Sequence, residues 1–137
     1  MAASIHRAPY YYLTVKDSPG AAYELLSRLA SSGVKLLAFS GVPTGVGASQ
    51  LVLFPEKEER LVRAAEESAL DLSGPEHALL IRGDDKLATL VEVHRQLSDA
   101  GINVASSSGV AADCGRFGYL LYVRSSDFER AAQLLDL

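Results

Sequence analysis

Hydrophobic and polar positions follow two different periods along the chain. Short stretches rich in aromatic and β-branched residues predict strands, and stretches whose apolar residues recur every three or four positions predict helices. A glycine follows the first helical pattern of each half and is expected to end that helix, at Gly33 and at Gly101. The elements expected in the first half are strands at 10–15, 36–40, 50–54 and 70–72 and helices at 22–29 and 58–70. Those expected in the second half are strands at 77–82, 102–106 and 119–124 and helices at 90–97 and 127–135.

The two halves of the chain repeat one another. When Gly33 is placed over Gly101, an offset of 68 residues (101 − 33), the apolar run 51–54 falls on the run 119–122. The order strand, helix, strand, strand, helix, strand is that of a ferredoxin-like βαββαβ unit. The sequence therefore predicts an α+β fold built from two ferredoxin-like repeats packed together.

The expected repeats span residues 9–73 and 76–137, with the short segment 73–75 as the link between them. A half of about 65 residues buries only about 60% of its unfolded surface, so each repeat is expected to need the other for stability. In the second half the sequence ends at Leu137, before a fourth strand. That strand is therefore expected to be missing or to be supplied by another segment.

Composition and charge narrow the classes of function. The chain has 137 residues, 48% of them apolar, and its 13 Lys and Arg stand against 17 Asp and Glu, a net charge of −4. A protein that follows a nucleic-acid backbone normally carries the opposite sign, so nucleic acid is not an expected partner. The apolar runs fall far short of the roughly 20 residues that cross a bilayer, and residues 1–7 are too polar for a signal peptide. With a single cysteine, Cys114, the chain is expected to be cytoplasmic and not to bind membranes.

Residue sets that carry catalysis or hold a metal are not found in the sequence. The three histidines, His6, His77 and His94, lack the spacing of metal ligands, so no metal site is expected. Cys114 lies in an expected turn with no histidine near it in the sequence, which argues against a catalytic nucleophile. Since no cofactor fingerprint occurs either, neither enzymatic activity nor a cofactor is expected.

The junction between the first strand and the first helix is the strongest candidate site. Asp17 or Ser18 can cap the helix, Pro19 suits its first position, and Gly20 places no side chain in front of it. Free N–H groups at an unobstructed helix N-terminus favour an anionic oxygen, such as a carboxylate. A capped helix start without a ligand is the alternative interpretation of the same residues.

The β-α-β-β-α-β frame with D-x-P-G at this junction resembles the ACT-domain family of small-molecule regulatory modules. The resemblance covers roughly residues 10–137 and rests on Asp17, Pro19, Gly20, Gly33-Val34 and, in the second half, Gly101-Ile102-Asn103-Val104. ACT domains typically bind an amino acid between two paired copies, one supplying this loop and the other an Asn at the start of its second strand. The resemblance therefore implies a ligand site made of Asp17, Ser18, Pro19, Gly20, Ala21 and Asn103.

The second half departs from this pattern. Its loop, 83–88, has Leu87 and Ala88 in place of the Pro-Gly pair, and Lys35 of the first half stands at the position of Asn103. Only the first loop combined with Asn103 keeps both features, so one competent site per chain is expected, at the junction of the two halves.

The expected ligand is a zwitterion. The backbone N–H groups of Gly20 and Ala21 would receive its carboxylate, and the oxygens of Asp17 and Asn103 would accept from its ammonium group. Apolar residues such as Leu37, Phe39 and Val104 are candidates for lining the pocket and point to an apolar or small ligand.

The function expected from the resemblance is that of a non-catalytic regulator or sensor that binds an amino acid, acting as a homodimer. One alternative is a protein–protein interaction module with a vestigial site, which docks on an enzyme or a transporter. A second alternative is a small enzyme that uses the cleft of a ferredoxin-like fold, although no residue set argues for it.

Overall fold

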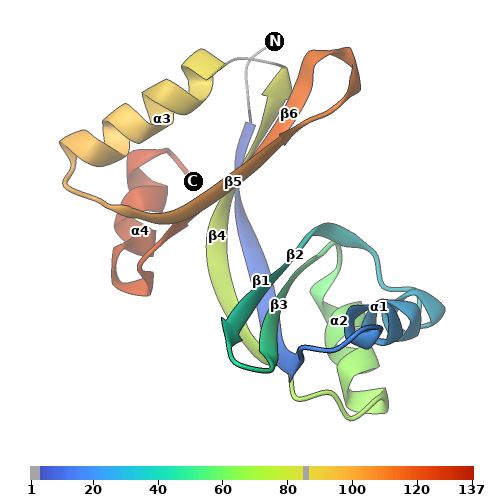
Figure 1. Ribbon diagram of the computed structural model, residues 1–137. Coiled ribbons are helices and arrows are strands. Elements are labelled where there is room, and N and C mark those ends of the chain that lie inside the picture. The colour runs from blue at the N-terminus through green and yellow to red at the C-terminus, as the bar shows by residue number, and fades with distance from the viewer. Residues whose placement is uncertain (1–3, 85–86) are drawn as a thin grey trace. The chain divides into compact units, whose positions relative to one another are not determined.

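The structure is a computed structural model that describes residues 4–84 and 87–137 (Figure 1). The first half contains β1 (Ser4–Lys16), α1 (Ala21–Ser31), β2 (Leu36–Gly45), β3 (Ala48–Pro55) and α2 (Glu58–Glu67). The second half contains β4 (Ser73–Asp84), α3 (Leu87–Asp99), β5 (Val104–Ala111), a 3₁₀ turn at Asp113–Gly115, β6 (Arg116–Val123) and α4 (Ser125–Leu134). The predicted α+β fold with the same order of elements in each half is confirmed.

The chain divides into two compact units, and both long strands contribute to each of them. The first unit comprises residues 9–76, and the second joins the residues up to Ala8 to residues 77–137. In the first unit the strand order is β2-β3-β1-β4, where β4 is represented by its first residues. In the second unit the order is β5-β6-β4-β1, where β1 is represented by residues 4–8. The strands on either side of β3 and β6 pair with them in antiparallel fashion.

The N-terminal residues of β1 supply the fourth strand that the second half lacks. The Ser4 hydroxyl donates to the Arg82 carbonyl of β4 at 3.5 Å, and Ile5 packs against the core of the second unit. Arg7 connects the same segment to α4, because its Nη1 lies 2.8 Å from Oε2 of Glu129 and its guanidinium lies 5.8 Å from the ring centre of Phe128. Residues 4–8 thus belong structurally to the second repeat.

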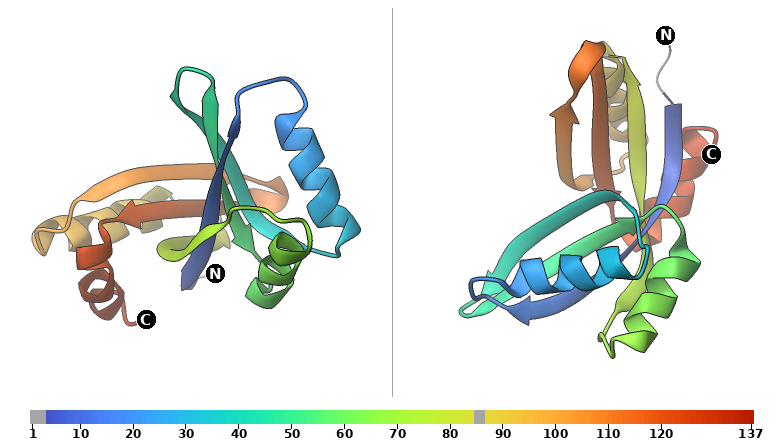
Figure 2. Two further views of the ribbon diagram at one scale, coloured as in Figure 1. Left: turned by 90° about the horizontal axis from the view of Figure 1, so that it is seen from below. Right: turned by 90° about the vertical axis from the view of Figure 1, so that its right-hand side faces the viewer.

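In each unit the two helices cover one face of the strands, as the views in Figure 2 show. The core of the first unit consists of strand residues two positions apart, Tyr11, Leu13, Leu51 and Leu53, and helix residues three or four positions apart, Leu25, Leu29, Leu61 and Ala64. The core of the second unit has the same plan: Leu79, Ile81, Phe117, Leu121 and Val123 from the strands, Ile102 before β5, and Val93, Leu97, Phe128, Ala131 and Ala132 from the helices. Burial of these apolar faces is the main force that holds each unit together.

Three local predictions are wrong. Residues 70–72 are not a strand, and the segment 73–75 is the start of β4 and not a link. The strand expected at 36–40 does not end there, because β2 continues to pair with β3 up to the Gly45–Ala48 pair. Pairing with a neighbouring strand extends or creates these strands, and a glycine-rich sequence alone does not reveal it.

Candidate functional site

A tight turn connects β1 to α1. The N–H of Ala21 donates to the Ser18 carbonyl at 3.3 Å, and Gly20 has φ 88° and ψ −9°. These angles match the third position of a type II turn, in which proline favours the second position and glycine the third. The segment Ser18-Pro19-Gly20-Ala21 satisfies both preferences.

The predicted capping of this helix is wrong. Helix α1 begins at Ala21, Gly20 is its N-cap, and no side chain donates or accepts a capping hydrogen bond. Pro19 stands before the helix and not in its first turn, because the Pro-Gly pair forms the type II turn. The side chains of Asp17 and Ser18 are consequently left exposed at the mouth of the turn.

The turn leaves backbone donors without acceptors. Among the residues that the structure describes, the N–H groups of Gly20, Ala22 and Tyr23 have no intramolecular acceptor, since the first helical bond runs from Glu24 to Gly20. The N–H of Ala21, expected to receive a ligand carboxylate, is donated to Ser18 instead. The sequence analysis does not find Ala22 and Tyr23, because it places Pro19 at the first position of the helix and the free donors move with the helix start.

The space in front of this turn is open. No atom lies within 4 Å of the position that a Cβ on Gly20 would occupy. A backbone hydrogen bond anchors the loop to the β2–β3 turn, because the N–H of Asp17 donates to the Gly47 carbonyl at 2.9 Å. The Asp17 carboxylate has no hydrogen-bond or ion-pair partner among the described residues. The turn therefore presents N–H donors and a carboxylate on one fixed, accessible loop.

Asn103 stands directly after the end of α3. Gly101 has φ 71°, its N–H donates to Ser98 at 3.0 Å, and the N–H of Ile102 donates to Leu97 at 2.8 Å. This pair of bonds is a Schellman motif, so the predicted glycine end of the helix is confirmed. Because Ile102 is buried in the core, Asn103 next to it points outward and is exposed. It lines an open groove of about 520 Å³ between α3 and β5.

The structure brings the loop residues together but leaves Asn103 in a separate unit. Asp17, Ser18, Pro19, Gly20 and Ala21 form one continuous turn of the first unit, and Asn103 belongs to the second unit. In the loop expected at 83–88, residues 85–86 lie outside the described residues, and Leu87 begins α3. Lys35, which stands at the position of Asn103 in the first repeat, lines a smaller pocket of about 140 Å³ together with Lys57 and Arg60.

Tyr11, which is not part of this loop, has a strongly raised pKa. Burial, and secondly a hydrogen bond with Glu58, raise the pKa of Tyr11 to about 12. The Tyr11 hydroxyl donates to Oε1 of Glu58 at 2.8 Å, and only 6% of the residue is exposed. Since Tyr11 is part of the first core, we interpret this shift as a structural feature that joins β1 to the start of α2.

Among the described residues, no group of three or more His, Cys, Asp or Glu is arranged to hold a metal ion. His77 packs against the ring of Phe128 at 5.6 Å, and Cys114 is an exposed free thiol. No helix in the part of the chain that the structure describes has the length and apolar character needed to span a membrane.

Comparison with known proteins identifies similar folds but no sequence family. No family model and no curated protein matches the chain. A protein of Bacteroides thetaiotaomicron has a similar structure, with a TM-score of 0.80, 14% identity, and coverage of 96% of this chain and 88% of that chain. The regulatory subunit of aspartate kinase from Thermus thermophilus is similar with a TM-score of 0.61, 15% identity, and coverage of 98% and 94%. The corresponding subunit from Thermus flavus is similar with a TM-score of 0.55, 14% identity, and the same coverage. The chain thus has the same α+β fold as these structures.

Proposed function

We propose that the chain is a non-catalytic regulatory protein that binds an amino acid at the β1–α1 turn. The observation that carries this proposal is the type II turn at Ser18–Ala21, which leaves three N–H groups free in front of an open space. Backbone donors at a helix N-terminus stabilise a carboxylate. The nearby Asp17 carboxylate can accept from an ammonium group, so one loop offers partners for both ends of a zwitterion.

Asn103 is proposed as the second part of the site. It directly follows the Schellman end of α3, its side chain is exposed, and the amide oxygen is an acceptor suited to an ammonium group. In our proposal the loop of a first repeat and Asn103 of a second repeat bind the same ligand, within one chain or across a homodimer. The likeness in fold to the regulatory subunits of aspartate kinase supports a regulatory role.

In the proposed mechanism, ligand binding is coupled to the relative arrangement of the repeats. A ligand that contacts two repeats binds more tightly to the arrangement in which both repeats reach it. The difference in its affinity for this arrangement and for the others shifts the population toward it. No cofactor, nucleic acid or membrane takes part in this proposal. The regulated partner would sense the arrangement of the repeats, and the protein would act as a cytoplasmic homodimer.

A thermal-shift screen with the twenty amino acids tests the proposal. A ligand present at about 100 times its dissociation constant adds about 2.7 kcal/mol to the free energy of unfolding, a shift of several degrees in Tm. For the amino acid that gives a shift, titration calorimetry should show at least a tenfold loss of affinity in Asn103→Ala. Lys35→Ala, at the same position of the first repeat, is the matched control and should bind like the wild type.

The outcomes separate this function from its alternative. Absence of a shift with every amino acid would favour an interaction module that docks on an enzyme or a transporter. Binding that is unchanged in Asn103→Ala would remove Asn103 from the site and leave the β1–α1 turn as the receptor.

A further inference from the structure

The groove between α3 and β5, which we call the α3–β5 groove, is lined mainly by polar side chains. His94 and Ser98 come from α3, Asn103 from the end of that helix, and Ser107 from β5. Gly101, Ile102 and Val104 complete a groove of about 520 Å³. The groove lies wholly within the second unit.

The positions of these side chains follow from the fold. His94 and Ser98 are four residues apart on α3, so they lie on the same face of the helix, next to the buried residues Val93 and Leu97. Ser107 pairs across the strands with Leu121, whose side chain belongs to the helix-covered core. Directly paired residues point to the same face of a sheet, so Ser107 also points to the side that α3 covers.

The first repeat has different chemistry at the same positions. With the offset of 68 residues, Leu26 corresponds to His94, Ala30 to Ser98 and Phe39 to Ser107. The structural register agrees, because Phe39 pairs with Leu53 just as Ser107 pairs with Leu121. Three groups that can donate and accept hydrogen bonds therefore stand where the first repeat has only hydrocarbon. The duplication offers an internal comparison, and only the repeat that carries Asn103 has this polar set.

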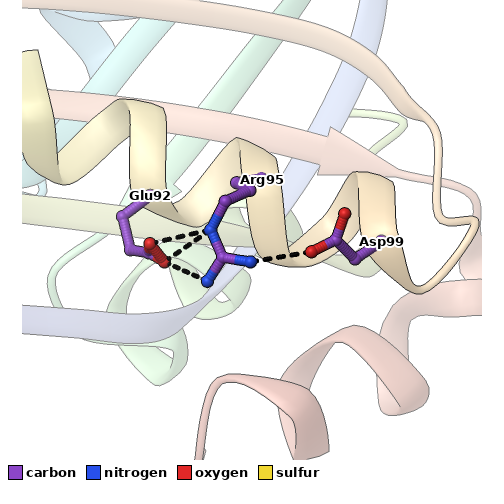
Figure 3. A network of polar contacts seen from close by, with 3 residues as sticks. All are labelled: Glu92, Arg95 and Asp99. Carbon is purple, nitrogen blue, oxygen red and sulfur yellow. Dashed lines mark hydrogen bonds and ion pairs between the residues drawn. The ribbon is translucent and has the colours of Figure 1, made fainter.

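The groove is lined by neither acidic nor strongly basic side chains, since none of the described residues that line it is Asp, Glu, Lys or Arg. The charges of α3 are engaged with one another along the helix, as Figure 3 shows for Glu92, Arg95 and Asp99. Arg95 Nε donates to Glu92 at 3.0 Å and Arg95 Nη1 to Asp99 at 2.7 Å. The hydrogen bond from Arg95 lowers the pKa of Glu92, which keeps this pair ionised and bound to itself.

We infer that the α3–β5 groove selects the side chain of the bound amino acid, and that it selects an uncharged group that both donates and accepts, a carboxamide above all. This inference rests on the proposed function for the backbone of the ligand and adds the identity of its side chain. A hydroxyl, an imidazole and an amide match a carboxamide because each offers a donor and an acceptor. A charged side chain finds no acidic or strongly basic partner among the described residues of the groove, and an aliphatic one leaves polar groups unpaired, which costs free energy.

Titration of the full chain with pairs of amino acids of equal size tests the inference. Asparagine should bind at least tenfold more tightly than leucine or aspartate, and glutamine at least tenfold more tightly than methionine. Each hydrogen bond that an aliphatic analogue cannot make is worth roughly fivefold in affinity. The triple variant His94→Leu/Ser98→Ala/Ser107→Ala should bring these ratios close to one. The matched control, Leu26→Ala in the first repeat, should leave them unchanged.

A second measurement needs no substitution. In two-dimensional NMR spectra of the wild type, asparagine should shift the amide signals of residues 103–107, and leucine at the same concentration should leave them in place. Equal affinities within each pair, a preference for leucine, or ratios unchanged in a folded triple variant would overturn the inference while the proposed function stands. If no amino acid binds to the wild type, both the proposed function and the inference are wrong.

Discussion

At the scale of single residues, Gly20 has the most specific role in the candidate site. Its φ of 88° lies in the left-handed region, and no neighbouring atom would obstruct a Cβ. The glycine is therefore required by the backbone conformation and not by lack of space. Gly20 is exposed and its N–H has no acceptor among the described residues, so one residue supplies both the turn conformation and a free donor.

Gly20→Ala should lower the free energy of unfolding by about 1 to 2 kcal/mol, because a Cβ is strained at positive φ. Urea unfolding measures the change. Gly45→Ala is the matched control, since Gly45 has open space as well but no positive φ, and its effect should be within about 0.5 kcal/mol of zero. Equal effects at the two positions would contradict the conformational explanation.

Tyr11 makes stability depend on alkaline pH. Its pKa is raised from 10.0 to about 12, so the folded chain holds the phenol proton more tightly than the unfolded chain does. The resulting stabilisation is complete below pH 10 and is lost as pH rises from 10 through 12. Tyr11→Phe should reduce stability at pH 7 by about 1 kcal/mol through the lost hydrogen bond, and the difference from wild type should shrink above pH 10.

Chemical unfolding of both proteins at pH 7, 9 and 11 measures this difference. Tyr12→Phe is the control on the same strand and should follow the wild type across the series. A gap between wild type and Tyr11→Phe that grows with pH would contradict the sign of the shift.

At the scale of secondary-structure elements, the sequence pattern did not predict that one strand can belong to both units. The first residues of β1 belong to the second unit, and the first residues of β4 belong to the first unit. The content of aromatic and β-branched residues located the centres of β1 and β4 but not the strands that pair with them. Residues 4–8 carry few apolar side chains, and they become strand because β4 offers unpaired backbone groups beside them. Arg7 and Ile5 then add contacts to α4 and to the second core.

Removal of residues 1–8 should destabilise the second unit more than the first. The deletion exposes the edge of β4 and removes Ile5 from the second core. Hydrogen exchange followed by mass spectrometry should show protection lost mainly in 77–84 and 125–134. The variant Arg7→Ala removes the ion pair but keeps the strand. It should lower the free energy of unfolding by no more than about 1 kcal/mol, because the pair with Glu129 is exposed. Uniform loss of protection in both units would contradict the assignment of these residues to the second.

At the scale of the whole molecule, the duplication explains why one repeat can specialise. Both repeats keep the same cores, helix ends and strand register, which maintain the fold. The sites differ, because the first repeat keeps the Pro-Gly turn and the second keeps Asn103 and the polar α3–β5 groove. In the proposed function each repeat supplies a different half of one receptor.

The periodicity of the sequence determined which segments are helix and strand, which of their faces are buried, and that the plan occurs twice. These properties depend on residues close together in the chain, such as the apolar faces around Leu25 and Val93 and the Schellman glycine Gly101. The type II turn is also determined locally, by Pro19-Gly20, although the sequence analysis predicts a helix cap from the same residues.

Only the tertiary structure decided which segment fills the fourth strand of the second unit and which side chains meet in the α3–β5 groove. Ser4 and Arg82 are 78 residues apart, and Ser107 faces α3 only because β5 pairs with β6 in one register. Contacts of this kind depend on hydrogen bonds between backbone groups that every residue except proline offers alike, and on side chains far apart in the chain. For that reason a single sequence specifies the elements more clearly than it specifies their partners.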